Sequence, residues 1–145
     1  MEQKNYTGVL ELTFSSFSES GIREEIGTER YRTKAYRDGD TTYLNWDMAD
    51  GSMGMELRAD RVVVLREGDD VNYRMELEFA KETLMELNTP HGVLRFTVLT
   101  TELAWDQNSD FPEQGCLDLL LVYDLFDRGQ KVSTRMMSGK MKPEA

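Results

Sequence analysis

The chain has few of the residues on which disulfides, metal sites and helical membrane spans depend. Its 145 residues include one cysteine, one histidine and three prolines. The single cysteine, Cys116, excludes a disulfide within the chain and fits a reducing compartment. No segment approaches the roughly 20 apolar residues of a membrane-spanning helix, and the first residues lack the pattern of a signal peptide. We therefore expect a cytoplasmic protein that does not associate with a membrane.

The shortage of histidine and cysteine also removes most catalytic arrangements. His91 has no second histidine to work with, and the chain carries neither zinc-like cysteine spacing nor a G-x-S-x-G nucleophile motif. Because His91 stands between Pro90 and Gly92, which are typical turn residues, we interpret it as an exposed turn position. We predict no catalytic residue and no cofactor, and we expect that the protein is not an enzyme.

One loop begins like a calcium-binding loop and then departs from the pattern. Asp106, Asn108 and Asp110 alternate as the first ligands of an EF-hand would, but Phe111 and Leu117 occupy the positions that require Gly and Glu. We predict no metal site. Phe111 and Trp105, in the same loop, are instead expected to fold over one end of the protein as a plug or a lid.

Basic residues are too few for a nucleic-acid-binding protein. The chain has 17 Lys and Arg against 27 Asp and Glu, a net charge of −10, which opposes contact with a polyanion. Arg30, Arg32 and Lys34 are a local exception, since they alternate along one face of an expected strand. They are interpreted as a solvated face that discourages edge aggregation, with an anionic ligand or an acidic partner as the alternative.

Period-two hydrophobicity dominates the chain, and helical spacing is not sustained anywhere, so the sequence predicts an all-β protein. A short helical turn is the alternative within residues 80–87. A tail from 138 to 145 is expected to fray. The expected strands cover residues 9–14, 28–37, 41–48, 53–60, 61–66, 71–79, 82–87, 93–103, 116–126 and 131–137.

Short strands joined by tight turns must bury their apolar faces together. A single antiparallel up-and-down β-barrel of about 8–10 strands does this and also removes exposed sheet edges. Residues 1–145 are expected to form one such domain. On the 116–126 strand, Leu120 and Val122 make the second face apolar as well, which indicates a covering segment or a homodimer interface.

Several polar aromatic and hydroxyl side chains fall on the stripes predicted to face inward. Buried tyrosines usually find hydrogen-bond partners within the protein. In an apolar barrel the same groups can orient a small ligand, with methionines adapting to its shape. The predicted ligand-binding residues are Tyr31, Trp46, Tyr73, Thr100 and Tyr123.

Three motifs give the chain a family resemblance: Tyr6-Thr7-Gly8 at the first strand, Thr89-Pro90-His91-Gly92 before VLRFTVLTTEL, and the late GCLDLLLVYDLF. With these the sequence resembles the YwiB-like bacterial proteins of unknown function. The resemblance implies a calycin-like, that is lipocalin-like, barrel whose interior can hold a small apolar or amphipathic ligand, but it supplies no activity. The alternative is a non-catalytic interaction or scaffold protein with a filled barrel, which works through its outer face or as a homodimer.

Overall fold

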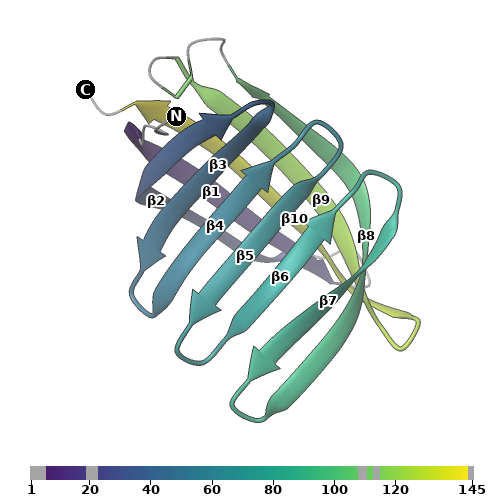
Figure 1. The fold of residues 1–145 in the computed structure, drawn as a ribbon. Coiled ribbons are helices and arrows are strands. Elements are labelled where there is room, and N and C mark those ends of the chain that lie inside the picture. The colour runs from purple at the N-terminus through teal and green to yellow at the C-terminus, as the bar shows by residue number, and fades with distance from the viewer. Residues whose placement is uncertain (1–5, 19–22, 108–110, 113–114, 144–145) are drawn as a thin grey trace.

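The computed structural model describes residues 6–18, 23–107, 111–112 and 115–143, with the backbone alone for residues 23–26. The described chain consists of strands joined by turns (Figure 1). The strands are β1 (Tyr6–Ser18), β2 (Arg23–Asp38), β3 (Thr41–Met48), β4 (Gly51–Leu57), β5 (Val62–Gly68), β6 (Asn72–Leu77), β7 (Glu82–Thr89), β8 (Gly92–Gln107), β9 (Leu117–Asp127) and β10 (Gln130–Pro143).

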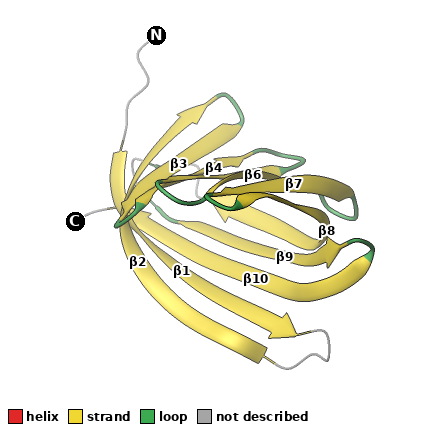
Figure 2. Ribbon diagram, turned by 90° about the horizontal axis from the view of Figure 1, so that it is seen from below, coloured by secondary structure: helices red, strands yellow, loops and turns green. Residues whose placement is uncertain are grey.

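These strands form one closed antiparallel barrel in which each strand pairs with the next along the chain. Closure is made by β1 and β10, whose ladder runs from Gly8 opposite Pro143 to Ser18 opposite Ser133. Seen from below, β3 to β7 and the remaining strands form two facing curved layers (Figure 2). The predicted all-β, up-and-down barrel is therefore confirmed, and the ambiguous segment at 80–87 contributes the strand β7 and not a helix.

The expected frayed tail is wrong for residues 138–143. They belong to β10 and lie between β1 and β9, where Met141 pairs with Leu10 on one side and Leu117 on the other. Met141 is 1% exposed. The polar residues around Met141 suggested a tail because only one face of this strand is buried.

The inward-facing residues of the strands form one continuous apolar core. Leu44 lies opposite Met55, which in turn lies opposite Val64 on the next strand. All three side chains are at most 1% exposed. Burying each such side chain stabilises the fold by roughly 1.5–3 kcal/mol. A slip of one residue would expose them all, so this alternation specifies which face of the sheet curls inward.

A β-bulge in β8 keeps an acidic side chain out of this core. The register with β9 shifts between Thr100 and Glu102, which leaves Thr101 as the extra residue. Thr100 and Leu103 therefore both lie opposite inward-facing residues of β9. Without the extra residue, strict alternation would turn Glu102 toward the interior.

The end of the barrel near the chain termini is closed by side chains. The Trp105 Nε1 donates a hydrogen bond to the Arg58 carbonyl oxygen at 2.9 Å, and the Thr42 hydroxyl donates to Gln107 Oε1 at 2.9 Å. Phe111 packs in the core and is 1% exposed. This arrangement agrees with the predicted plug. Of the calcium-like triplet, Asn108 and Asp110 lie outside the described residues.

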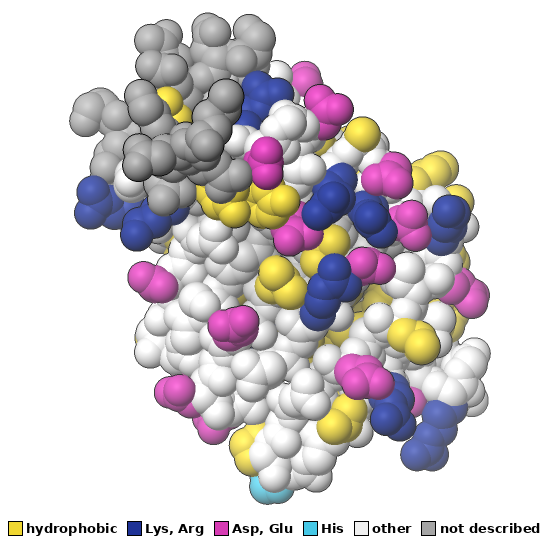
Figure 3. All heavy atoms as spheres, viewed as in Figure 1, with side chains coloured by type: hydrophobic (Ala, Val, Ile, Leu, Met, Phe, Trp, Pro, Cys, Tyr) yellow, Lys and Arg dark blue, Asp and Glu magenta, His cyan; other side chains and the backbone are white. Residues whose placement is uncertain are grey.

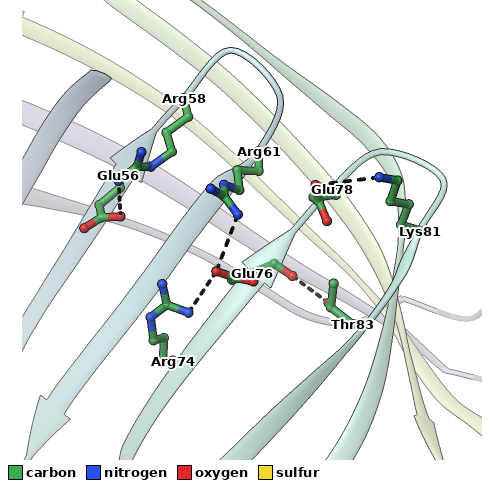
Figure 4. A network of polar contacts seen from close by, with 8 residues as sticks. All are labelled: Glu56, Arg58, Arg61, Arg74, Glu76, Glu78, Lys81 and Thr83. Carbon is green, nitrogen blue, oxygen red and sulfur yellow. Dashed lines mark hydrogen bonds and ion pairs between the residues drawn. The ribbon is translucent and has the colours of Figure 1, made fainter. Parts of the chain in front are cut away.

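The ladder between β6 and β7 is the shortest in the barrel, with three residue pairs between Asn72–Arg74 and Glu86–Asn88. Beyond it, the Thr83 hydroxyl donates to the Glu76 carbonyl oxygen at 2.6 Å. The Glu76 carboxylate pairs on the outer face with Arg74 at 2.9 Å and Arg61 at 3.9 Å (Figure 4). Such exposed ion pairs contribute at most about 1 kcal/mol each. Side-chain contacts thus replace part of the backbone ladder between β6 and β7, which we call the β6–β7 seam.

Phe79 is exposed, whereas the sequence pattern predicts that it is buried, because the chain leaves the sheet at the β6–β7 seam. The alternating pattern of residues 71–79 places it on the buried face, yet it is 62% exposed. The chain leaves β6 after Leu77, and residues 79–81 turn toward β8, where the Ala80 N–H donates to the Thr100 carbonyl oxygen at 2.8 Å. The positive φ of Ala80, 61°, marks this turn.

Candidate functional site

A cavity of about 320 Å³ is lined by residues of β5 to β10 at the end of the barrel away from the plug, and two of these residues, Val132 and Arg135, are exposed to solvent. Most of its lining is apolar, and four polar side chains from two separate strand pairs join it. The lining residues are Arg66, Val71, Tyr73, Met75, Met85, Leu87, Phe96, Tyr123, Leu125, Val132 and Arg135.

The four polar residues come from two cross-strand pairs, each made of one arginine and one tyrosine. Arg66 of β5 lies directly opposite Tyr73 of β6, and Arg135 of β10 lies directly opposite Tyr123 of β9. Directly opposite residues project from the same side of a sheet. We call these four residues the Arg–Tyr cluster. Barrel closure brings the two pairs to one cavity from strands that are far apart in the sequence.

The tyrosines of the Arg–Tyr cluster have raised pKa values. Burial raises the pKa of Tyr123 to about 12, while the neighbouring Tyr73 adds to the rise and the Arg135 charge opposes it. Burial likewise raises the pKa of Tyr73, and the charges of Arg66 and Arg135 oppose that rise. Both hydroxyls are therefore protonated at neutral pH, so each can donate a hydrogen bond.

The two arginines of the cluster differ in their partners. Arg66 donates from Nη2 to Asp50 Oδ2 at 2.8 Å and from Nη1 to the Met48 sulfur at 3.3 Å. Within the part of the chain that the structure describes, no carboxylate forms an ion pair with Arg135. Arg135 is exposed to solvent, so it is a cation without a carboxylate partner at the open side of the cavity, beside two tyrosine hydroxyls.

Two of the predicted ligand-binding residues, Tyr73 and Tyr123, line this cavity, and the other three do not. Tyr31 stacks on Trp46 with ring centroids 5.8 Å apart. Partial burial raises the pKa of Tyr31 to about 12, helped by its hydrogen bond to the Glu29 carboxylate and opposed by the Arg66 charge. Tyr31 and Trp46 therefore extend the polar aromatic region past Arg66.

Thr100 is adjacent to the cavity in the sheet but is fully buried. It lies opposite Tyr123, and its hydroxyl oxygen has no hydrogen-bond partner among the described residues. The Nε1 of Trp46 and the hydroxyl of Ser133 are likewise buried without a partner in the described part of the chain. Unsatisfied buried polar atoms are costly and uncommon. The barrel interior thus retains hydrogen-bonding capacity that the protein itself does not use.

A second and wider hollow, about 990 Å³, lies along β3 to β7 and shares Arg66 and Tyr73 with the smaller cavity. It is open to solvent, and on the face of the molecule seen in Figure 3 acidic and basic side chains are interspersed. We favour the smaller cavity because it is less open and its walls are mainly apolar beside the converging polar groups. The wider hollow also includes Leu65, Glu67, Arg74, Leu84 and Glu86.

Other sequence candidates lie away from the cavity. His91 is exposed in the turn between β7 and β8, as predicted, and the Thr89 hydroxyl accepts a hydrogen bond from its backbone N–H at 3.2 Å. Cys116 is half-buried. The basic residues Arg30, Arg32 and Lys34 are exposed on β2, where Arg30 pairs with Glu11 at 2.8 Å. Among the described residues no cluster of metal-ligating side chains is found.

Comparison with known proteins places the chain in a family. A family model described as a domain of unknown function, DUF1934, matches residues 16–138. The chain belongs to this family. The fold is similar to the crystal structure of ywiB protein from Bacillus subtilis, with a TM-score of 0.81 and 16% identity over 99% of this chain and 96% of that one. The predicted YwiB-like resemblance is confirmed.

No curated protein matches the sequence of this DUF1934 member. Its described residues contain no helix with the length and apolar character needed to cross a membrane. The calycin-like relationship and the cytoplasmic location stay predictions.

The cavity of this DUF1934 member contains two arginines that the sequence pattern did not single out. Arg66 ends the RVVVLR run and Arg135 lies within KVSTRMM, and an arginine at either position is expected on the solvent face. Arg66 does continue the inward alternation of Val62 and Val64, which was the available signal. Arg135 gave a weaker signal, because a register shift between Lys131 and Ser133 interrupts the pattern of its strand.

Proposed function

We propose that the protein is a non-catalytic binding protein that holds one small amphipathic molecule in the barrel cavity. The observation that carries this proposal is the union of apolar walls with the Arg–Tyr cluster in one cavity. Small-molecule sites typically combine a mainly apolar lining with a few convergent polar groups that fix orientation.

The size of the cavity also favours a small ligand. Its volume of about 320 Å³ falls at the lower end of the usual range for ligand pockets, roughly 300–1,000 Å³. The side chains of Met75, Met85 and Phe96 supply apolar area, whose removal from water contributes about 25 cal/mol per Å². Methionine side chains also adapt to ligands of varied shape.

Native mass spectrometry of protein purified gently from its host tests this proposal. We expect a small molecule that is retained in the native spectrum and lost on denaturation. Val132 lines the cavity and is 47% exposed, so Val132→Trp can block the cavity without overfilling the core. Val93→Trp is the matched control, because Val93 is 49% exposed and does not line the cavity.

The expected result is loss of the retained mass from Val132→Trp and its persistence in Val93→Trp. Equal retention by both variants would place the ligand elsewhere. Protein that carries no small molecule and takes up no small amphipathic compound when one is added would contradict the proposal.

A role as an interaction protein is the second candidate function, and exposed apolar side chains favour it. Leu84 on β7 is 73% exposed and Phe79 is 62% exposed, while Leu120 and Val122 on the outer face of β9 are half-buried. Light scattering on the wild type and on Leu84→Glu tests whether the surface around Leu84 forms a homodimer. A wild-type protein that stays monomeric at high concentration would count against the dimer.

A further inference from the structure

One arginine of the Arg–Tyr cluster, Arg135, has no carboxylate partner among the described residues. This favours an anionic ligand over a neutral or cationic one. The Asp50 carboxylate accepts a hydrogen bond from Nη2 of the Arg66 guanidinium at 2.8 Å. Arg135 projects from the same side of the sheet as Tyr123, is exposed to solvent where it lines the cavity, and has no carboxylate partner among the described residues. A cation at the edge of an apolar cavity gains most from an anion that arrives with the ligand.

The donors around Arg135 suit a carboxylate. A guanidinium presents a planar fork of N–H groups that matches the two oxygens of a carboxylate. The hydroxyls of Tyr73 and Tyr123 add two further donors within the same cavity lining. Neither an ammonium nor a neutral hydroxyl would satisfy this set of donors as well.

The cavity volume sets the length of the apolar part. A water molecule takes about 30 Å³ of liquid, so a cavity of about 320 Å³ corresponds to about ten waters or ten non-hydrogen atoms. Below the cluster the walls are side chains of Met75, Met85, Leu87, Phe96 and Leu125, which offer no charged partner.

We infer that the cavity binds a medium-chain carboxylate, with the carboxylate on Arg135 and the tyrosine hydroxyls and the alkyl chain among the methionines and Phe96. This inference rests on the proposed function and specifies the chemistry of its ligand. Arg66, the other arginine of the cluster, already forms an ion pair with Asp50, so we do not assign the ligand carboxylate to it.

Calorimetric titration with octanoate, octan-1-ol and octylammonium tests the inference with ligands of matched length. At neutral pH we expect octanoate to bind at least about tenfold more tightly than octanol, and octylammonium to bind more weakly than both. Only octanoate can accept charge-assisted hydrogen bonds from Arg135 as an anion, and a tenfold difference in affinity corresponds to about 1.4 kcal/mol.

Two arginine variants locate the carboxylate. Arg135→Gln is expected to lower octanoate affinity about tenfold and to leave octanol affinity unchanged. Arg95→Gln is the control, because Arg95 is exposed on β8, pairs with Glu86 at 3.2 Å and does not line the cavity. It should change neither affinity.

The outcomes separate this inference from the proposed function. Equal binding of octanoate and octanol would overturn the carboxylate class and leave the cavity as a ligand site. A preference for octanoate that survives Arg135→Gln would overturn the assignment of the carboxylate to Arg135. Failure of all three compounds to bind ligand-free protein would overturn the inference and the proposed function together.

Discussion

Thr100 and Thr33 offer a comparison of two fully buried threonines that differ in one hydrogen bond. The Thr33 hydroxyl donates to the Tyr31 carbonyl oxygen at 3.1 Å, whereas the Thr100 hydroxyl has no partner among the described residues. Both side chains are 0% exposed. A buried hydroxyl without a partner costs about 1–3 kcal/mol, and valine has nearly the same shape.

We therefore expect Thr100→Val to raise the free energy of unfolding of the ligand-free protein by about 1 kcal/mol and Thr33→Val to lower it by about the same amount. Urea unfolding of the wild type and both variants measures these differences. A loss of stability in Thr100→Val as large as that in Thr33→Val would mean that the Thr100 hydroxyl has a partner in solution.

Tyr123 makes stability depend on pH at alkaline values. Its pKa is raised to about 12 in the folded protein by burial, against about 10 in an unfolded chain. Between these values the folded state holds a proton that the unfolded state has released, so the free energy of unfolding falls as pH rises. The full stabilisation is present below about pH 10 and is lost as pH rises through about 12.

A shift of about two pKa units corresponds to roughly 2–3 kcal/mol. We expect Tyr123→Phe to lose about that much less stability than the wild type between about pH 9 and pH 12. Urea unfolding at both pH values gives the comparison. Equal losses in the two proteins would show that Tyr123 titrates normally in the folded state.

At the scale of elements, the β6–β7 seam is the least bonded part of the barrel. Its ladder has three residue pairs, and the Thr83 hydroxyl supplies one of the remaining links through the Glu76 carbonyl oxygen. Segments with few backbone hydrogen bonds open at lower free energy than the rest of a protein. The seam is also next to the cavity, which Tyr73 of β6 and Met85 of β7 both line.

Amide hydrogen exchange should be faster in β6 and β7 than in β9 and β10, and Thr83→Val should speed it further in residues 76–83. Thr97→Val on β8 is a suitable control, because Thr97 makes no hydrogen bond through its side chain within the described chain. Uniform protection of all strands, unchanged in Thr83→Val, would contradict a weak seam.

The positions of the strands, and which of their side chains face the core, could be predicted from the sequence because successive side chains of a strand point to opposite faces of the sheet. Leu44, Trp46 and Met55 fall on the inward side as their spacing indicates. The alternation does not encode where a chain leaves the sheet, so the pattern places Phe79 in the wrong environment. The alternation also does not encode closure of the barrel, which depends on the pairing of β1 with β10, two strands far apart in the sequence.

That closure governs the molecule as a whole. Residues 138–143 pair with β1, from Thr13 opposite Ser138 to Gly8 opposite Pro143, and Met141 is buried there. Removing residues 138–145 would expose both the β1 edge and the core beneath it. We expect a loss of several kcal/mol, comparable with the total stability of a domain, about 5–15 kcal/mol.

Thermal unfolding followed by circular dichroism tests this prediction. The truncated chain should lose its cooperative transition or show a much lower midpoint. A chain that lacks only residues 144–145 is the control and should unfold like the wild type. A truncated chain as stable as the control would mean that β10 beyond residue 137 does not contribute to closure.

The candidate site could be predicted only in part, because it depends on the closed barrel. Tyr73 and Tyr123 could be predicted from their place in apolar stripes, whereas the alternation that includes Arg66 was a weak signal and that of Arg135 was interrupted by a register shift. From the sequence alone, an arginine within a strand is expected on the solvent face. Only closure turns Arg66 and Arg135 toward a shared space.

The central claim is that the barrel cavity binds a medium-chain carboxylate. A crystal structure of the protein grown with octanoate would test it most directly, since it would show both the cavity and the contacts of the carboxylate. We predict one octanoate in the cavity, with its carboxylate within hydrogen-bond distance of Arg135 and its chain against Met75, Met85 and Phe96. An interior filled by the protein's own side chains, with no octanoate density between the two Arg–Tyr pairs, would contradict it.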